Sequence, residues 1–118
     1  MISLRIVTVL AFTAFAAAAA QQQPSYKREV PDSLAKQAKI TEAQALAAAQ
    51  KRVPKGTAKA LELEKEKGKL VYSFEFAVPG KTGIDEVNVD AMTGKVLSVE
   101  HESPEDEKNE AKKPPKKP

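Results

Sequence analysis

The sequence predicts an α+β fold in which one N-terminal helix packs on an antiparallel four-stranded β-meander sheet. Three observations support this prediction. Residues 40–53 carry apolar side chains at helical spacing, whereas residues 57–100 contain four segments in which apolar and polar side chains alternate. Glycine and proline stand between these segments, where turns are required. With 118 residues, the chain has room for one small domain.

The first twenty residues are predicted to be a secretory signal peptide. One positive charge at Arg5 precedes an uncharged run, Ile6 to Ala20, that ends in small residues. The alternative is a membrane anchor, but the run is shorter than the ~20 residues that cross a bilayer. We expect cleavage between Ala20 and Gln21, which exports the protein to the periplasm or the extracellular space. Cleavage removes Arg5 and lowers the formal net charge from +3 to +2.

Two polar segments are predicted to flank the folded part without joining it. Residues 21–33 form a disordered linker, and residues 103–118 form a disordered tail with four acidic and five basic residues. The tail ends in lysine and proline, so it is either a tether to an anionic surface or a solubilising extension. The folded domain is expected to span residues 34–102.

The predicted helix begins and ends at recognisable signals. Thr41 is an N-cap, and Gln44, three residues later, completes a capping box. Pro54 and Gly56 end the helix. The apolar stripe consists mostly of alanine, so the helix should lie close against the sheet. The stripe contains Ile40, Ala43, Leu46, Ala47 and Val53, with Ala49 at its edge.

The four predicted strands cover residues 57–67, 70–78, 84–90 and 95–100. Their alternation assigns one set of side chains to the helix-facing side: Leu61, Leu63, Leu70, Tyr72, Phe74, Phe76, Val78, Val87, Val89, Leu97 and Val99. The opposite side should be polar and displayed to solvent. It supplies the candidate partner-binding face: Ser73, Glu75, Glu86, Asn88 and Glu100. The first of these strands is rich in lysine and glutamate, which suits an edge of the sheet.

Asp90 and Gly94 are predicted to form a structural turn between the last two strands. An aspartate at the start of a turn accepts a hydrogen bond from a backbone N–H two residues on, and glycine takes the left-handed conformation. A general acid–base role needs a second carboxylate in a pocket, and a Ca²⁺ loop needs acidic residues at alternate positions. The sequence around Asp90 offers neither.

Three motifs give the chain a family resemblance. They are "ITEAQALAAA" at the helix start, "LELEKEKGKLVYSFEF" across the first hairpin, and "VDxxTGxV" in the closing hairpin (Val89, Asp90, Thr93, Gly94 and Val96). Together, Ala38 to Glu100 resembles a PepSY domain. The resemblance implies a helix against an antiparallel sheet in extracytoplasmic bacterial proteins, and a role in restraining peptidases. Because no peptidase catalytic domain follows, inhibition is expected to act in trans.

The sequence does not predict an enzyme, a cofactor, a metal site or nucleic-acid binding. His101 is the only histidine and is interpreted as a solvated surface residue. There is no cysteine and no glycine-rich phosphate loop, and no serine stands in a motif that would activate it. Two hypotheses remain. The first is an exported, non-catalytic binding module that regulates or inhibits an envelope peptidase. The alternative is a structural envelope protein tethered to an anionic surface by its basic tail.

Overall fold

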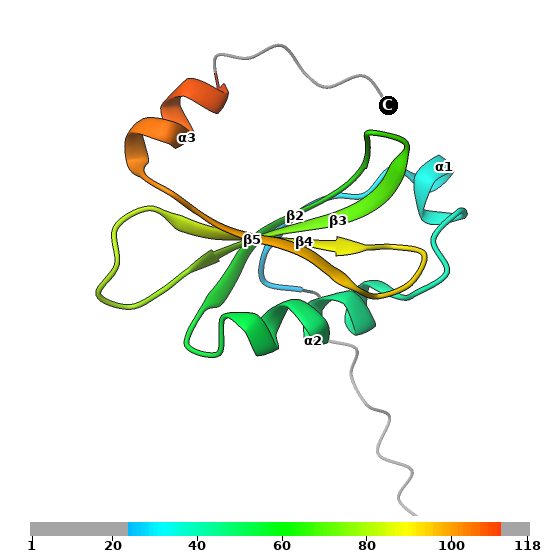
Figure 1. Cartoon of the computed structure of the whole chain (residues 1–118), viewed down its shortest axis with the longest axis horizontal. Coiled ribbons are helices and arrows are strands. Elements are labelled where there is room, and N and C mark those ends of the chain that lie inside the picture. The colour runs from blue at the N-terminus through cyan, green and yellow to red at the C-terminus, as the bar shows by residue number, and fades with distance from the viewer. Residues whose placement is uncertain (1–23, 112–118) are drawn as a thin grey trace, which may run out of the picture.

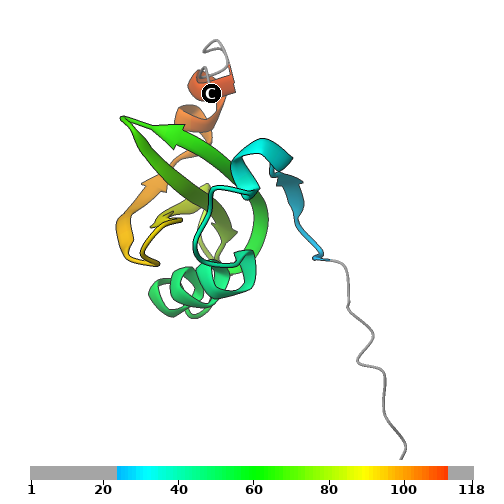
Figure 2. The ribbon, with the colours of Figure 1, turned by 90° about the vertical axis from the view of Figure 1, so that its right-hand side faces the viewer.

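A computed structural model of the chain describes residues 24–111 as a mixed sheet with helices on both sides (Figure 1). The strands are β1 (Lys27–Glu29), β2 (Thr57–Glu66), β3 (Lys69–Ala77), β4 (Ile84–Asp90) and β5 (Val96–Glu102). The helices are α1 (Asp32–Ala35), α2 (Glu42–Arg52) and α3 (Pro104–Ala111). Figures 1 and 2 place α2 and α3 on opposite sides of the sheet. None of the helices within residues 24–111 is both long enough and apolar enough to cross a membrane.

The α+β class is confirmed, but the sheet has five strands in the order β1-β2-β3-β4-β5 and not the predicted four. Strands β2 to β5 form the antiparallel meander, and β1 adds a parallel partner to β2. The additional strand lies in the segment predicted as a disordered linker. All three β1 residues are exposed, so no apolar alternation marks the strand in the sequence. From Ala60 to Glu62, β2 therefore has a neighbouring strand on each side and is not an edge there.

Helix α2 has the predicted capping box but buries only part of the predicted stripe. The Thr41 hydroxyl accepts a hydrogen bond from the Gln44 N–H, and the Gln44 side chain accepts one from the Thr41 N–H. Ala45 and Ala49 are fully buried, whereas the predicted Ala43 is exposed, as is Ala47. Alanine occurs all around this helix, so its apolar pattern does not fix which side faces the sheet. The small buried residues do allow the predicted close approach.

The core lies between α2 and the sheet, and it confirms the alternation predicted for β2, β3 and β4. Phe74 and Phe76 have no exposed surface, and neither do Val87 and Val89. Residues from β2 complete this layer, because Leu61 and Leu63 are also buried. The face that these residues occupy is called the inner face below, and the opposite face is called the outer face.

Of the inward pair predicted for β5, Val99 does lie on the inner face, but the prediction for Leu97 is wrong because the strand contains a bulge. Asn88 pairs with Ser98 but Val89 pairs with Val96, so Leu97 is the additional residue. The partly buried Val96 takes the inner position against the core. Val99 pairs with Val87 on the inner face but is 40% exposed, and Leu97 is 37% exposed.

Residues 104–111 form helix α3, in the segment predicted to be a disordered tail. The helix begins with a reciprocal cap. The Asp106 N–H donates to the Ser103 hydroxyl, and the Ser103 N–H and hydroxyl donate to the Asp106 carboxylate. Proline at the first helical position and acidic residues in the first turn strengthen this start. Together with α1, this makes three helices within residues 24–111, against the one predicted.

Candidate functional site

The outer face holds all five residues of the candidate partner-binding face: Ser73, Glu75, Glu86, Asn88 and Glu100. The strand register brings Ser73 opposite Asn88, and Asn88 opposite Ser98. The Ser73 hydroxyl donates to Asn88 Oδ1 at 2.7 Å, and Asn88 Nδ2 donates to Ser98 Oγ at 3.0 Å. These bonds form a polar chain across three strands. Ser73 is buried within this chain of hydrogen bonds, whereas it was predicted to be displayed to solvent. The role of this face in binding stays a prediction.

A shallow hollow of about 300 Å³ lies on the outer face beside the β2–β3 hairpin. Val71 and Leu97 are its apolar lining, and Asn88 and Ser98 connect it to the polar chain. Lys67 and Lys69 contribute positive charge to its lining. The β5 bulge creates this arrangement, because it turns Leu97 away from the core side. The hollow was not predicted, because regular alternation placed Leu97 on the inner face.

The other end of the outer face is strongly acidic. Helix α3 turns back over the sheet there, so carboxylate oxygens of Glu86, Glu102 and Glu110 lie within 4.8 Å of one another. Burial, followed by the neighbouring carboxyl groups of Glu86 and Glu110, raises the pKa of Glu102 to about 8. Burial and the charge of Glu86 also raise the pKa of Glu75. Glu102 and Glu110 were not predicted to belong to this face, because both lie at or beyond the predicted domain boundary.

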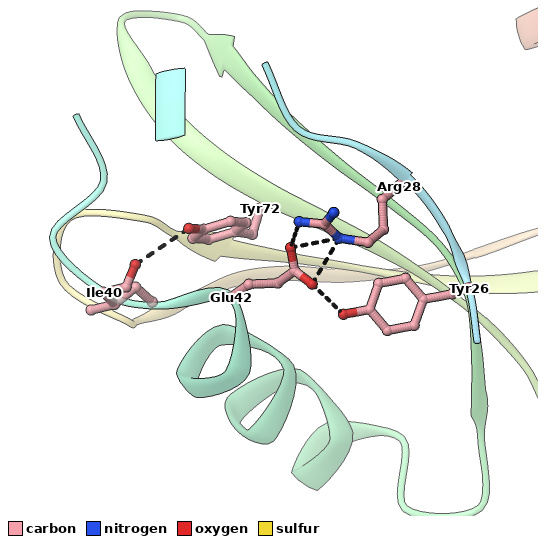
Figure 3. Close-up of polar contacts among 5 residues, drawn as sticks. All are labelled: Tyr26, Arg28, Ile40, Glu42 and Tyr72. Atoms are coloured by element: carbon pink, nitrogen blue, oxygen red, sulfur yellow. Dashed lines mark hydrogen bonds and ion pairs between the residues drawn. The ribbon is translucent and has the colours of Figure 1, made fainter. Parts of the chain in front are cut away.

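Strand β1 is fastened to the start of α2 by three polar side chains (Figure 3). The Tyr26 hydroxyl donates to Glu42 Oε2 at 2.7 Å. The Arg28 guanidinium donates to both oxygens of the same carboxylate, with Nε at 2.9 and 3.0 Å. Burial alone would raise the pKa of Glu42, but the hydrogen bonds from Arg28 and Tyr26 outweigh burial and lower it. Nearby, the Tyr72 hydroxyl donates to the Ile40 carbonyl at 3.3 Å.

Glu42→Gln is expected to lower the free energy of unfolding by about 1–2 kcal/mol at neutral pH, because it weakens a charge-assisted pair that is only partly screened. A lowered pKa contributes stability above the ordinary value of 4.5, and this contribution is lost as pH falls through the folded-state pKa. The difference between wild type and variant should therefore shrink in acid. Urea denaturation at about pH 7 and about pH 3 measures it. The exposed Glu105→Gln is the control, and an equal difference at both pH values would contradict the ion pair.

The Asp90–Gly94 turn has the geometry that a structural role requires. Asp90 Oδ1 accepts a hydrogen bond from the Met92 N–H at 2.8 Å. The Gly94 N–H donates to the Asp90 carbonyl at 2.8 Å, and Gly94 has a φ of 80°. These contacts use the Asp90 carboxylate to shape the hairpin that joins β4 to β5.

Gly94→Val is expected to cost about 1–3 kcal/mol of stability, and Asp90→Ala about 1 kcal/mol. An added Cβ at Gly94 would lie 3.7 Å from Ile40 Cδ1, an ordinary contact, so the cost comes from the positive φ. Gly94→Asn is the control, since asparagine tolerates this conformation and should lose less. Thermal melts give the comparison. If Asp90→Ala melts like wild type but loses a bound ion or an activity, the turn interpretation is wrong.

His101 was predicted to be a solvated surface residue, but its side chain is paired with Asp85. Its Nδ1 lies 2.7 Å from Asp85 Oδ1, and Lys81 Nζ lies 3.7 Å from the other oxygen of the same carboxylate. The pairing follows from the register, which sets Asp85 opposite His101. Within the described part of the chain, no hydroxyl group hydrogen-bonds to the imidazole. The observed role of the pair is to tie β4 to β5.

The predicted cleavage site at Ala20 and Gln21 lies outside the described residues, and so do the lysines of residues 112–118.

The family model described as "PepSY: Peptidase propeptide and YPEB domain" matches residues 39–100, more than half of the 118-residue chain. The match takes in α2, β2, β3, β4 and most of β5. Among curated proteins and among solved structures, no significant match was found.

Proposed function

Because the chain belongs to the PepSY family, the peptidase propeptide and YPEB domain, we propose that the protein is a non-catalytic binding module that restrains a peptidase in trans. The observation that carries this proposal is the extent of the family match. It covers the unit built from α2 and most of the meander, which is also the unit that contains the core. The resemblance inferred from the sequence motifs is confirmed by the same match.

We further propose that the protein acts after export, in the periplasm or the extracellular space. The order of Arg5, the apolar run and Ala18-x-Ala20 supports cleavage before Gln21. Mass spectrometry of the protein recovered outside the cytoplasm tests this proposal. A species that still contains residues 6–15 would indicate an anchor instead.

The outer face is the surface proposed to contact the peptidase. It offers an apolar spot at Leu97, the polar side chains of Asn88 and Ser98, and lysines that line the hollow, above the buried Val71 and Ser73. Most of this surface is polar, so the interaction should be modest in affinity and weakened by salt. Leu97 is the residue expected to be most sensitive, since apolar groups in a hollow are typical anchors.

The test uses two apolar residues of β5 that differ in face but hardly in exposure. Leu97→Asp changes the outer face at a residue that is 37% exposed, whereas Val99→Asp changes the inner-face edge at a residue that is 40% exposed. Each purified protein is immobilised, bound envelope peptidases are eluted, and their proteolytic rates are measured with and without the free protein. Wild type and Val99→Asp should slow the captured peptidase, and Leu97→Asp should slow it at least about tenfold less, a difference of about 1.4 kcal/mol.

Two results would overturn the proposal. The first is that no captured peptidase is slowed by the wild-type protein. The second is that the wild-type protein associates with membranes or wall polymer and a variant ending at Ala111 does not, with no peptidase slowed by either. That second result would support the tether alternative. All four acidic residues of the segment 103–118 lie on α3, so the lysines beyond it carry a net positive charge.

A further inference from the structure

Residues 24–30, called the strap below, lie along β2 and contain β1. The strap pairs in parallel with Ala60, Leu61 and Glu62 of β2. Tyr26 and Val30 are partly buried against the core, and the other five residues of the strap are exposed. All the buried core residues within the described range lie beyond residue 30, and the family match begins only at residue 39. The strap is therefore a thin addition at the margin of a core that other residues build.

Two side chains of the strap meet complementary groups on the rest of the domain. The Tyr26 ring meets the Phe74 ring edge-on, with the ring centroids 6.3 Å apart. The Arg28 guanidinium donates to both carboxylate oxygens of Glu42, and the Tyr26 hydroxyl donates to one of them (Figure 3). Tyr26 and Arg28 are two positions apart, so both point to the same side of the extended strap. An aromatic and a basic side chain of the strap thus face an aromatic ring and a carboxylate.

These attachments can open while the core stays folded. The ladder to β2 is three residues long, and the Arg28 side chain is 42% exposed. Ion pairs that water reaches contribute little to stability. Segments with little buried apolar surface and exposed backbone hydrogen bonds open locally at a lower free energy than global unfolding requires. We therefore expect the strap to leave β2 before α2 and the meander unfold.

An open strap would leave a binding site for another extended segment. The backbone of β2 from Ala60 to Glu62 would lose its strand neighbour on that side, and unpaired strand edges bind further strands. Glu42 would lose its cation but would keep its place in the first turn of α2. The site would therefore select a segment with an aromatic residue for Phe74 and, two positions later, a basic residue for Glu42.

We propose that the strap is a displaceable, autoinhibitory cover, and that an extended segment of a partner protein, with an aromatic residue two positions before a basic one, replaces it on β2. The strap itself shows that this edge accepts such a segment, and the charge of Glu42 complements the basic residue. The site shares no lining residue with the hollow of the outer face, so it does not depend on the contact proposed there.

A fluorescent peptide with the sequence of residues 24–31, PSYKREVP, is the probe, and its binding to the purified protein is measured by anisotropy. Arg28→Gln weakens the strap's own hold but leaves Glu42 and β2 intact for the peptide. Lys27→Gln removes the same charge from an exposed residue that pairs only weakly, with Glu29 at 3.5 Å, and is the matched control. Glu29→Cys combined with Glu62→Cys locks the strap, because these exposed residues are paired neighbours and the chain has no other cysteine.

Arg28→Gln should bind the peptide at least about tenfold more tightly than Lys27→Gln or wild type does, because the strap then covers the site for less of the time. The lock, introduced into the Arg28→Gln protein, should abolish binding until the disulfide is reduced. A peptide with alanine in place of Tyr26 and Arg28 should bind at least about tenfold more weakly than the original.

Hydrogen exchange shows whether the strap opens by itself. Arg28→Gln should speed exchange of the β1 amides and leave that of the β3 amides unchanged. Faster exchange in both strands, or in neither, would overturn the proposal that the strap is displaceable. The proposal is also overturned if Arg28→Gln binds the peptide no more tightly than Lys27→Gln, or if the locked and reduced proteins bind it equally. A dimer of Arg28→Gln that the lock abolishes would show that the strap of a second copy takes the site, and would overturn the assignment to a partner segment.

Discussion

Phe74→Ala should lower the free energy of unfolding by about 3–5 kcal/mol, the usual cost of removing a fully buried phenylalanine. The side chain has no exposed surface and lies in the middle of β3. The centroid of its ring is 6.2 Å from the ring centroid of Phe76 and 6.4 Å from that of Tyr72. It also meets Tyr26 edge-on at 6.3 Å, so it connects the core to the segment that carries β1.

The consequence should be visible in the folded fraction of the protein. Domains of this size are stable by about 5–15 kcal/mol, so the variant keeps only a small margin. Urea denaturation of the purified proteins gives the change directly. Val99→Ala is the control: it lies on the same inner face but is 40% exposed, and it should cost no more than about 0.5 kcal/mol. A loss below about 1 kcal/mol for Phe74→Ala would mean that its ring is not a central part of the core.

The strands around Phe74 were predictable because their pattern admits one interpretation. Five large apolar residues at every second position from Leu70 to Val78 can be buried together only if the segment is a strand. The start of α2 was equally well determined, since Thr41 and Gln44 satisfy each other locally. In both cases the interactions that decide the structure lie within a few residues in the sequence.

The β5 strand shows where the same reasoning fails. Its segment contains apolar residues at 96, 97 and 99, so two phases of alternation are compatible with it. The bulge places Val96 on the inner face and turns Leu97 outward. This placement depends on the pairing with β4, which the local sequence does not encode. The hollow of the candidate site depends on the same bulge and was missed for the same reason.

Strand β1 and helix α3 were missed for different reasons. Strand β1 is stabilised by contacts far away in sequence, including the Arg28–Glu42 pair, and none of its residues is buried. Helix α3 does have a local signal, since Ser103 and Asp106 cap each other. The segment was predicted to be disordered from its polar composition, and the cap was not taken into account. As a result, the outer-face residues of β3 and β4 were predicted, but the Glu102–Glu110 side of the face was not.

Gly83→Ala should be the second strongly destabilising change, with an expected cost of about 3 kcal/mol or more. Gly83 precedes β4 and has a φ of 77°, which strains any other residue. A Cβ at this position would also lie 2.0 Å from the Glu102 carbonyl oxygen and 3.1 Å from Ser103 Cα. Backbone atoms cannot swing aside as a side chain does, so the end of β5 must move.

Gly80→Ala separates the two contributions, since Gly80 has a φ of 82° but an added Cβ there has nothing within 4 Å. It should therefore cost only about 1–2 kcal/mol from backbone strain. The difference between the two variants in urea denaturation measures the close approach of Gly83 to Glu102. Equal stability of the two variants would show that the approach of Gly83 to the end of β5 does not constrain the fold.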